Sequence, residues 1–210
     1  MQTTAHSTRR HTLFLLTGFA ALSLAVHLRT LAKFDCYTTT WMNAIGSRPM
    51  DWLMTFVTAL ASPELSMAVL LALCAALWRR FGWRSAAWLF GVFAATALLE
   101  LALKNCVFQP GPHGMIHRFA FREGWIHFVL PYAYPSGHAL RALLLTGVMA
   151  CWLMPRAATF WWTLGGLVAL SRLYLGCHWT SDVLGGVMLA LASLWMVGLR
   201  INSRHELPAP

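Results

Sequence analysis

The segment PSGHALRALLLTGVMACWLM, residues 135–154, joins a short polar motif to a long apolar run. A helix needs about 20 consecutive, mostly apolar residues to cross a bilayer. Residues 136–154 meet this requirement, and Pro155 ends the run because proline cannot continue a helix. The segment therefore predicts a membrane-spanning helix with polar groups in its first turn.

Five more apolar runs of similar length are found at 12–28, 63–78, 85–103, 157–175 and 180–199. A shorter apolar stretch at 51–61 is interpreted as an interfacial or re-entrant helix. Hydrophobic residues make up 58% of the chain and charged residues 11%, which excludes an ordinary soluble domain. We predict an all-α, polytopic membrane protein with six transmembrane helices, folded as one domain over residues 1–210 with flexible tails at 1–9 and 201–210.

Basic residues in short loops predict how the chain lies in the membrane, because such residues collect on the cytoplasmic side. One side of the six-span arrangement carries eight arginines: Arg9, Arg10, Arg79, Arg80, Arg84, Arg156, Arg200 and Arg204. That side, with both termini, is predicted to be cytoplasmic, and the polar motifs then meet at the outer face. The net charge of +9 reflects this topology and attraction to anionic headgroups, so no nucleic-acid partner is expected.

A second polar motif begins at Ser171-Arg172 and continues through His178 and Asp182. His178 and Asp182 are four residues apart, so on a helix they share one face and the carboxylate can orient the imidazole. An imidazole held in this way acts as a nucleophile or a base. Arg172 adds a planar set of donors that suits phosphate oxygens. The motif predicts a phosphate-handling site.

In the first motif, Ser136 stands where a helix would begin, and the free N–H groups of a helix N-terminus bind anions. His138 follows within the first turn and can pass a proton to a leaving oxygen. A lone histidine in an apolar helix is more often a packed residue. Two histidines, an arginine and an aspartate within two apolar segments are costly to bury, which favours a functional site.

At these residues the chain resembles the type 2 phosphatidic acid phosphatase superfamily, membrane lipid phosphatases related to the vanadium haloperoxidases. The family's Pro-Ser-Gly-His motif is complete at 135–138, and its Ser-Arg, His and Asp motif is complete at 171–182. A third family motif is Lys, six residues, then Arg-Pro. Lys104 and Pro112 match it, but Gly111 replaces the arginine. The resemblance covers 104–182.

The resemblance implies a role for each matching residue. His178 corresponds to the nucleophile, Asp182 to its orienting partner and His138 to the acid that protonates the leaving group. The phosphate-binding positions correspond to Lys104, Ser136, Gly137 and Arg172. The family uses no metal or other cofactor. The seven acidic residues of this chain agree, because they are scattered along the sequence and a two-metal site needs clustered carboxylates.

Gly111 removes a guanidinium that would stabilise charge on the transferring phosphoryl group. We hypothesise that Arg118, Arg122 or Arg141 supplies it, with Arg118 and Arg122 favoured because they lie in the loop that follows Gly111. The alternative is that these arginines contact lipid headgroups.

The expected function is metal-independent hydrolysis of a lipid phosphate or polyprenyl diphosphate through a phosphohistidine. Family resemblance gives undecaprenyl diphosphate, phosphatidylglycerophosphate, phosphatidic acid and lipid A as candidates, and a bacterial inner membrane as the location. A lipid phosphotransferase using the same site is an alternative. A non-catalytic lipid-phosphate binder or transporter is another, favoured by Gly111 and opposed by the His178–Asp182 pair. The sequence does not define an oligomeric state.

The sequence leaves two interpretations open for the connection at 105–134 and for three of the cysteines. The connection at 105–134 is either a lipid entrance or an interfacial loop packed on its own helices; its aromatic residues are Phe108, Phe119, Phe121, Trp125 and Phe128. Cys36, Cys106 and Cys177 are predicted toward the outer face, where a disulfide is chemically allowed but has no support in the sequence.

Overall fold

The computed structural model describes residues 2–112, 114–122 and 130–202, and within these ranges every regular element is helical. The α-helices are α1 (Gln2–His27), α2 (Ala32–Ala44), α3 (Arg48–Ala59), α4 (Pro63–Phe81), α5 (Trp83–Cys106), α6 (Gly137–Val148), α7 (Ala158–Tyr174) and α8 (Thr180–Asn202). A π-helical turn at Met149–Leu153 extends α6, and a 3-10 turn at Pro155–Ala157 leads into α7. The predicted all-α class is confirmed.

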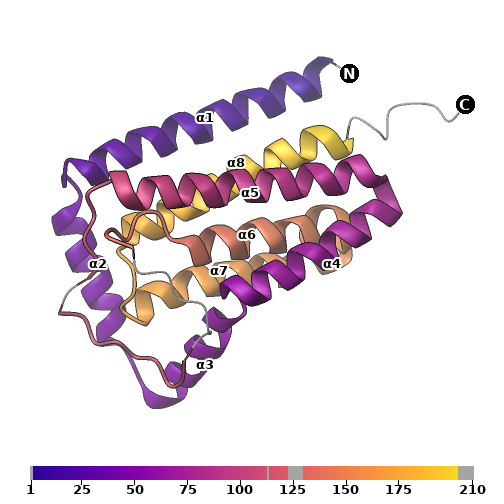
Figure 1. Cartoon of the computed structure of the whole chain (residues 1–210). Helices are drawn as coiled ribbons and strands as arrows, with labels where there is room; N and C mark the ends of the chain where they lie inside the picture. The colour runs from indigo at the N-terminus through magenta and orange to yellow at the C-terminus, as the bar shows by residue number, and fades with distance from the viewer. Residues whose placement is uncertain (1, 113, 123–129, 203–210) are drawn as a thin grey trace, which may run out of the picture.

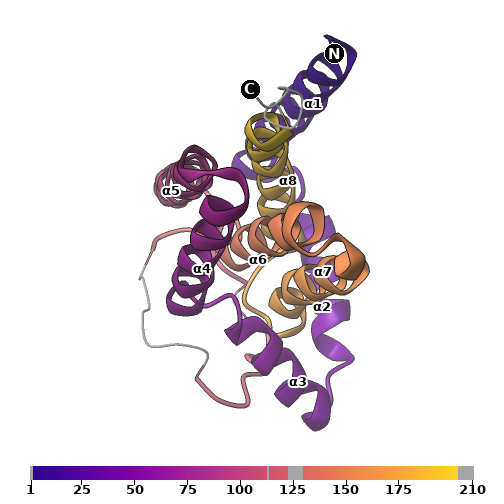
Figure 2. The ribbon, with the colours of Figure 1, turned by 90° about the vertical axis from the view of Figure 1, so that its right-hand side faces the viewer.

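The long helices lie side by side, and α2 and α3 lie across one end of them (Figure 1). The start of α1 and the end of α8 are found at the opposite end. In the end-on view of Figure 2, the pair α4–α5 stands beside the group formed by α6, α7 and α8. Helix α8 packs against α1, α5 and α6, and α6 also packs against α7. The end covered by α2 and α3 is therefore where α5 ends, α6 begins, α7 ends and α8 begins.

Helices α6 and α8 form the centre of the core. The side chains of Leu140, Leu144 and Val148 on α6 are buried, as are Ala190 and Val197 on α8. This core fixes the relative positions of the two helices that carry the polar motifs.

Close approach of α8 to the start of α6 depends on two glycines. A Cβ atom at Gly186 would lie 2.5 Å from the carbonyl oxygen of Ser136, and one at Gly185 would overlap the ring of Tyr134. The backbone N–H of Ser136 donates to the carbonyl oxygen of Asp182 at 2.9 Å. The two motifs are thus joined directly through the backbone.

Candidate membrane spans are fewer than the sequence suggested. In the part of the chain that the structure describes, α5 and residues 180–198 of α8 are long and apolar enough to cross a membrane. The number rises to four if α1 with α2, bent by 94°, and α3 with α4, bent by 49°, each count as one span. Six spans are not confirmed, because α7 has 17 residues and α6 with its π-turn is a shorter apolar helix.

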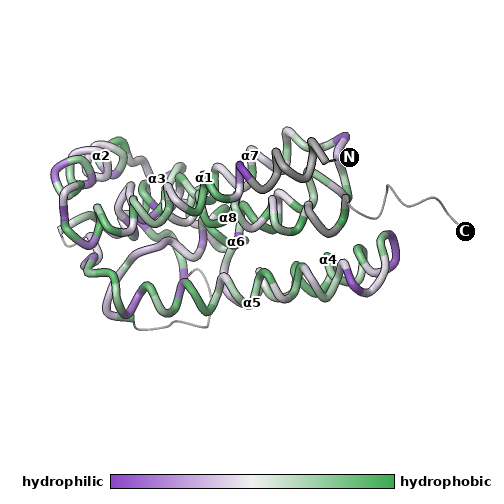
Figure 3. Tube along the Cα trace, turned by 90° about the horizontal axis from the view of Figure 1, so that it is seen from above, coloured by the Kyte–Doolittle hydropathy of each residue, from purple (hydrophilic) through white to green (hydrophobic). Residues whose placement is uncertain are grey.

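Hydropathy along the helices still fits an integral membrane protein. Figure 3 shows hydrophobic residues along α4 and α5, with hydrophilic residues gathered at the turn that joins them. That turn carries Arg79, Arg80 and Arg84. Many large apolar side chains on these helices face outward, among them Leu71, Phe90 and Leu98. Outward apolar side chains of this kind suit contact with lipid.

Every predicted apolar run forms a helix, and 51–61 forms most of α3. Helix α1 begins at Gln2, ten residues before its expected start, whereas the ends of the other helices lie within a few residues of the predicted ones. Helix α2 was not predicted, because Lys33, Asp35 and the threonines at 38–40 interrupt its apolar pattern. In α2 the polar side chains face the interior and the aromatic side chains face outward, the opposite of a helix in a soluble protein. Asp35, Thr39 and Asn43, spaced four apart, are buried, whereas Tyr37 and Trp41 are exposed. Helix α2 therefore turns a polar stripe toward the interior.

Candidate active site

The residues singled out in the sequence motifs lie at the end of the bundle covered by α2 and α3. Lys104 comes from the end of α5, Ser136, Gly137 and His138 from the start of α6, and Arg172 from the end of α7. His178 lies in the α7–α8 connection and Asp182 in the first turn of α8. Four helix ends thus bring one set of polar groups together.

His178 and Asp182 form an oriented pair. Nδ1 of His178 lies 3.2 Å from Oδ2 of Asp182, and the backbone N–H of Trp179 donates to the same oxygen at 2.9 Å. The Asp182 carboxylate is fully buried and the His178 ring nearly so. If Nδ1 carries the proton that faces the carboxylate, Nε2 keeps a lone pair for attack.

The surroundings of His178 keep its ring neutral. Burial is the main cause, and the positive charges of Lys104, Arg172 and Arg141 add to it, so the pKa of His178 falls well below its ordinary value. A neutral imidazole is the form that can attack phosphorus. The cations placed to hold a phosphate therefore add to burial in keeping the His178 ring unprotonated.

The start of α6 has the form of an anion-binding helix end. The hydroxyl oxygen of Ser136 is buried and has no hydrogen-bond partner among the described residues. A Cβ atom at Gly137 would overlap the carboxylate of Glu100, so any larger residue here would displace that carboxylate from its present position. His138, half-buried, follows in the same turn. Free N–H groups, a hydroxyl and an imidazole thus share one helix terminus.

Two cations are held from other helices. Nη1 of Arg172 donates to Oγ1 of Thr58 at 2.8 Å, and its guanidinium carbon lies 5.9 Å from the centre of the Phe119 ring. Nζ of Lys104 donates to the carbonyl oxygen of Ala133 at 3.0 Å. Arg172 and Lys104 are both buried, which strengthens their interaction with an anion.

Glu100 links the Lys104 amine to a third cation. Its carboxylate lies 3.9 Å from Nζ of Lys104 and 3.2 Å from Nη1 of Arg141. Arg141 is close enough for its charge to act on both His138 and His178. We name Glu100, Lys104 and Arg141 the Glu100 cluster. The contact of Glu100 with Arg141 depends on how α5 and α6 pack.

Arg118 and Arg122, the other two arginines considered as replacements for the one missing at Gly111, lie elsewhere. Nε of Arg118 donates to the carbonyl oxygen of Asn43 at 2.8 Å, and its Nη1 lies 3.8 Å from Asp51. Arg122 is exposed. Neither arginine is among the charges that act on His138 or His178.

Sequence reasoning missed Asp35, which reaches the site from α2. Its Oδ1 accepts from the backbone N–H of Ser181 at 2.8 Å, and its Oδ2 accepts from the Ser181 hydroxyl at 2.6 Å and from Gln109 at 3.3 Å. Asp35 therefore holds the first turn of α8 against the loop that follows Lys104. The available signal was weak, because Asp35 stands in a segment of mixed polar and apolar residues.

The remaining predictions for this region are only partly within the described residues. Phe108 packs edge-on against Tyr132, Phe119 lies under Arg172, and Phe121 lies beside Trp52. Trp125 and Phe128 lie outside the described residues. All five cysteines are free, so the structure contains no disulfide among Cys36, Cys106 and Cys177. Within the described ranges, no group of three or more His, Cys, Asp or Glu residues is arranged to hold a metal ion.

Known proteins with similar sequences are phosphatases. The chain is 25% identical over 192 residues to a protein named phosphatidylglycerophosphatase B from Bacillus subtilis, covering 85% of this chain and 89% of that one. It is 27% identical over 113 residues to a putative undecaprenyl-diphosphatase from Escherichia coli, covering 50% of this chain and 57% of that one. An undecaprenyl-diphosphatase from Sulfolobus acidocaldarius is 42% identical over 62 residues, 28% of each chain.

A solved structure has the same fold. It is described as a transmembrane PAP2-type phosphatidylglycerolphosphate phosphatase from Bacillus subtilis, and it superposes with a TM-score of 0.72 at 21% identity over 94% of this chain and 97% of that one. Residues 85–205, more than half of the chain, match the family model of the PAP2 superfamily. The chain therefore belongs to the PAP2 superfamily, as its motifs predicted.

Proposed function

We propose that this chain hydrolyses a membrane lipid phosphate or diphosphate through a phosphohistidine intermediate on His178. The observation that carries the proposal is the His178–Asp182 pair, 3.2 Å apart and buried among Lys104, Arg172 and Arg141. A protein that only bound the lipid would need the cations but no oriented, neutral imidazole. The names of its relatives support the same class of reaction.

In the first half of the proposed cycle, the phosphate is held by Lys104, Arg172 and the start of α6. Nε2 of His178 attacks phosphorus, and the bond to the lipid oxygen breaks as His138 protonates that oxygen. Asp182 accepts the hydrogen bond from Nδ1 and stabilises the positive ring.

In the second half, His138 takes a proton from water. The water oxygen attacks phosphorus, the phosphorus–nitrogen bond breaks and phosphate leaves, so His178 returns to its neutral form. The proton that His138 gave up in the first half is thereby replaced. The cycle consumes one water molecule and releases the dephosphorylated lipid and phosphate.

Arg141 takes the place of the missing arginine in this proposal. It reaches the site from the second turn of α6, while Glu100 fixes its guanidinium at 3.2 Å. This replaces the initial preference for Arg118 or Arg122 and keeps the third candidate. A charge near the transferring phosphoryl group stabilises the transition state more than the bound substrate.

Phosphatidylglycerophosphate is the favoured substrate among the four candidates, because the relative that covers most of this chain is named for it. Undecaprenyl diphosphate is the second candidate, supported by the two shorter matches. The site lies at the end of the bundle opposite the start of α1 and the end of α8. With both termini in the cytoplasm of a bacterial inner membrane, the site faces the periplasm.

Detergent-purified protein tests the proposal through phosphate release from four lipids in the presence of EDTA: phosphatidylglycerophosphate, undecaprenyl diphosphate, phosphatidic acid and lipid A. His178→Ala is expected to lose at least about a thousandfold in kcat, because it removes the nucleophile. His11→Ala is the matched control, since His11 stacks on Trp195 far from the motifs. Acid-labile, base-stable phosphate trapped on the wild-type protein and absent from His178→Ala would identify the intermediate. Release that survives in His178→Ala would contradict the mechanism.

A further inference from the structure

A pocket of about 220 Å³ lies between α4, α6 and α7. Its lining is almost wholly apolar and comprises Leu60, Ala61, Leu65, Ser66, Val69, Ala142, Leu145, Thr146, Met149, Trp161, Leu164 and Val168. Leu65 and Val69 are partly exposed, so the pocket reaches the outer surface of the bundle along α4. We call this space the α4–α7 groove.

The groove begins directly at the candidate site. On α7, Val168 lies one turn before Arg172, and on α6, Leu145 lies one turn after Arg141. Ala61 follows three residues after Thr58, whose hydroxyl receives the hydrogen bond of Arg172. Two of the walls, α6 and α7, therefore carry an arginine of the candidate site one turn from the groove, and the segment that leads into α4 follows Thr58 of α3. A hydrocarbon chain attached to a phosphate at Arg172 would be within reach of the groove.

One polar group marks the upper part of the groove. The hydroxyl of Ser66, in the first turn of α4, is buried and has no hydrogen-bond partner among the described residues. The other hydroxyl, that of Thr146, already donates to the carbonyl oxygen of Ala142. A buried donor without an acceptor is costly, and a ligand that brings a carbonyl oxygen removes that cost.

Ester carbonyls lie next to the phosphate-bearing glycerol in a diacyl lipid, whereas a polyprenyl chain has no acceptor beyond its phosphates. We propose that the α4–α7 groove binds an ester-linked acyl chain of the substrate, with Ser66 donating to the ester carbonyl. The proposal rests on the proposed function, since the phosphate must be held at Arg172.

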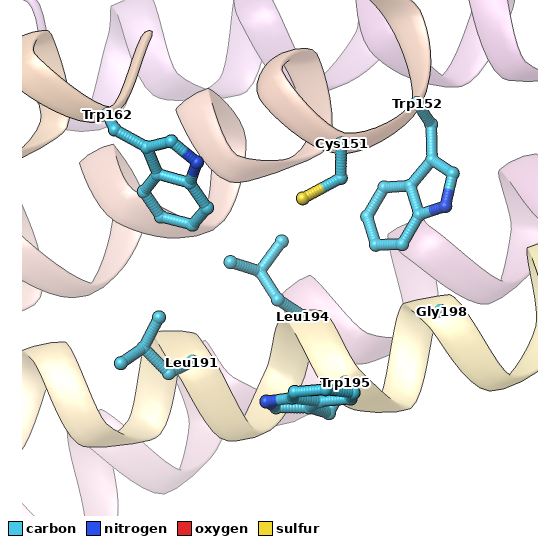
Figure 4. A pocket seen from close by; sticks show the side chains of 7 residues that line it. All are labelled: Cys151, Trp152, Trp162, Leu191, Leu194, Trp195 and Gly198. Atoms are coloured by element: carbon cyan, nitrogen blue, oxygen red, sulfur yellow. The ribbon is translucent and has the colours of Figure 1, made fainter. Parts of the chain in front are cut away.

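A second apolar pocket provides an internal control. It has a volume of about 290 Å³ and lies against the π-turn after α6, the start of α7 and the later part of α8. Figure 4 shows Trp162, Cys151 and Trp152 on one side of it, with Leu191, Leu194 and Trp195 of α8 on the other. None of its lining residues lies within a helical turn of a motif residue, so filling it leaves the path from the phosphate unchanged.

The same substitution in the two pockets tests the groove. Leu164→Trp narrows the α4–α7 groove and Leu191→Trp narrows the second pocket; both leucines are half-buried. Leu164→Trp is expected to lower kcat/KM about tenfold for dioleoyl phosphatidic acid and to leave hydrolysis of para-nitrophenyl phosphate within about twofold. Leu191→Trp is expected to change neither. The proposal is wrong if Leu164→Trp lowers kcat/KM equally for the two substrates, or if it does not lower kcat/KM for phosphatidic acid.

Ser66→Ala tests the ester contact. It is expected to lower kcat/KM about fivefold for the diester lipid and to leave the matching diether lipid unchanged. Trp161→Phe is the control, because it removes another buried hydrogen-bond donor of the groove. Trp161 lies three turns before Arg172 on α7, about 16 Å along the helix, so its ring cannot reach the ester carbonyl of a lipid whose phosphate is held at Arg172. The acyl assignment is wrong if Ser66→Ala lowers kcat/KM equally for the diester and diether lipids. It is also wrong if Leu164→Trp lowers kcat/KM for undecaprenyl diphosphate and not for phosphatidic acid.

Failure of the groove and failure of the proposed function give different results. Loss of para-nitrophenyl phosphate hydrolysis in His178→Ala supports the site whatever the groove does. A phosphatidic acid with a photoreactive diazirine in its acyl chain provides a readout without turnover in His178→Ala. Labelling of α4 and α7 around Val69 and Leu164 is expected, and labelling confined to the second pocket would exclude the proposal.

Discussion

Two ion clusters at the same end of the bundle look alike and are expected to do different things. In the Glu100 cluster, Arg141 pairs with Glu100 at 3.2 Å; in the cluster around Asp51, Arg118 pairs with Asp51 at 3.8 Å. Both arginine side chains are 16% exposed. Only Arg141 has its charge among those that act on His138 and His178. Arg118 instead joins α2 to α3 through Asn43 and Asp51, so burial of an arginine does not by itself indicate a catalytic role.

The largest expected effect separates these two arginines. Arg141→Ala is expected to lower kcat about a hundredfold, because it removes a charge that stabilises the transferring phosphoryl group. Arg118→Ala is expected to stay within about threefold in kcat, since its charge acts at the α2–α3 corner. Phosphate release measured for both variants at saturating lipid checks this. Similar losses in the two variants would remove the distinction between the clusters.

The carboxylates of Asp35 and Asp51 can be compared in the same way as the two arginines. Asp35→Asn is expected to lower kcat about tenfold, because an amide cannot accept both Ser181 donors and the first turn of α8 then shifts with Asp182. Asp51→Asn weakens the contacts to Tyr174 and Arg118 and is expected to leave kcat within about threefold. If Asp35→Asn and Asp51→Asn lower the melting temperature by similar amounts but only Asp35→Asn lowers kcat, Asp35 is a positioning residue. Equal kcat values would argue that it is only structural.

Restoring the family arginine tests whether Arg141 compensates for Gly111. No atom lies within 4 Å of a Cβ built at Gly111, so Gly111→Arg fits without a clash at its branch point. In the Arg141→Ala background it is expected to recover about tenfold in kcat, because the new guanidinium replaces the lost one. Gly111→Lys is the control, since an amine lacks the planar pair of donors. Recovery that is equal with lysine would show that charge alone suffices.

The smallest expected effect is on stability at low pH. The pKa of His178 is lowered in the folded protein, so below about pH 6.5 the unfolded chain binds a proton that the folded chain does not. Stability is therefore present above that pH and declines as the pH falls. The melting temperature of the wild-type protein is expected to drop a few °C more than that of His178→Gln between about pH 7.5 and 5. Parallel curves would indicate that the pKa of His178 is the same in the folded and unfolded protein.

The sequence predicted the ends of the long helices and the motifs at their ends, because apolar runs and proline act locally. It missed α2, whose polar stripe looks like a loop in the sequence and is stable only because Asp35, Thr39 and Asn43 meet α7, α8 and the loop after α5. Its prediction of six spans is not confirmed. Length and apolarity of a run do not show whether a neighbouring helix or the lipid covers it, and α6 is almost wholly covered by protein.

For the site, the sequence by itself determined which groups are proposed to take part: two histidines, Asp182, Arg172 and Lys104 match motifs of the family. The spacing of four residues predicted the His178–Asp182 pair, but His178 precedes α8, so the turn before that helix completes the pairing. The choice of Arg141 over Arg118, the bridge through Glu100 and the groove below Arg172 were decided only by the tertiary structure. Each depends on how close separate helices pack, and that distance depends on residues far apart in the sequence, such as Gly186 of α8 against the backbone of Ser136.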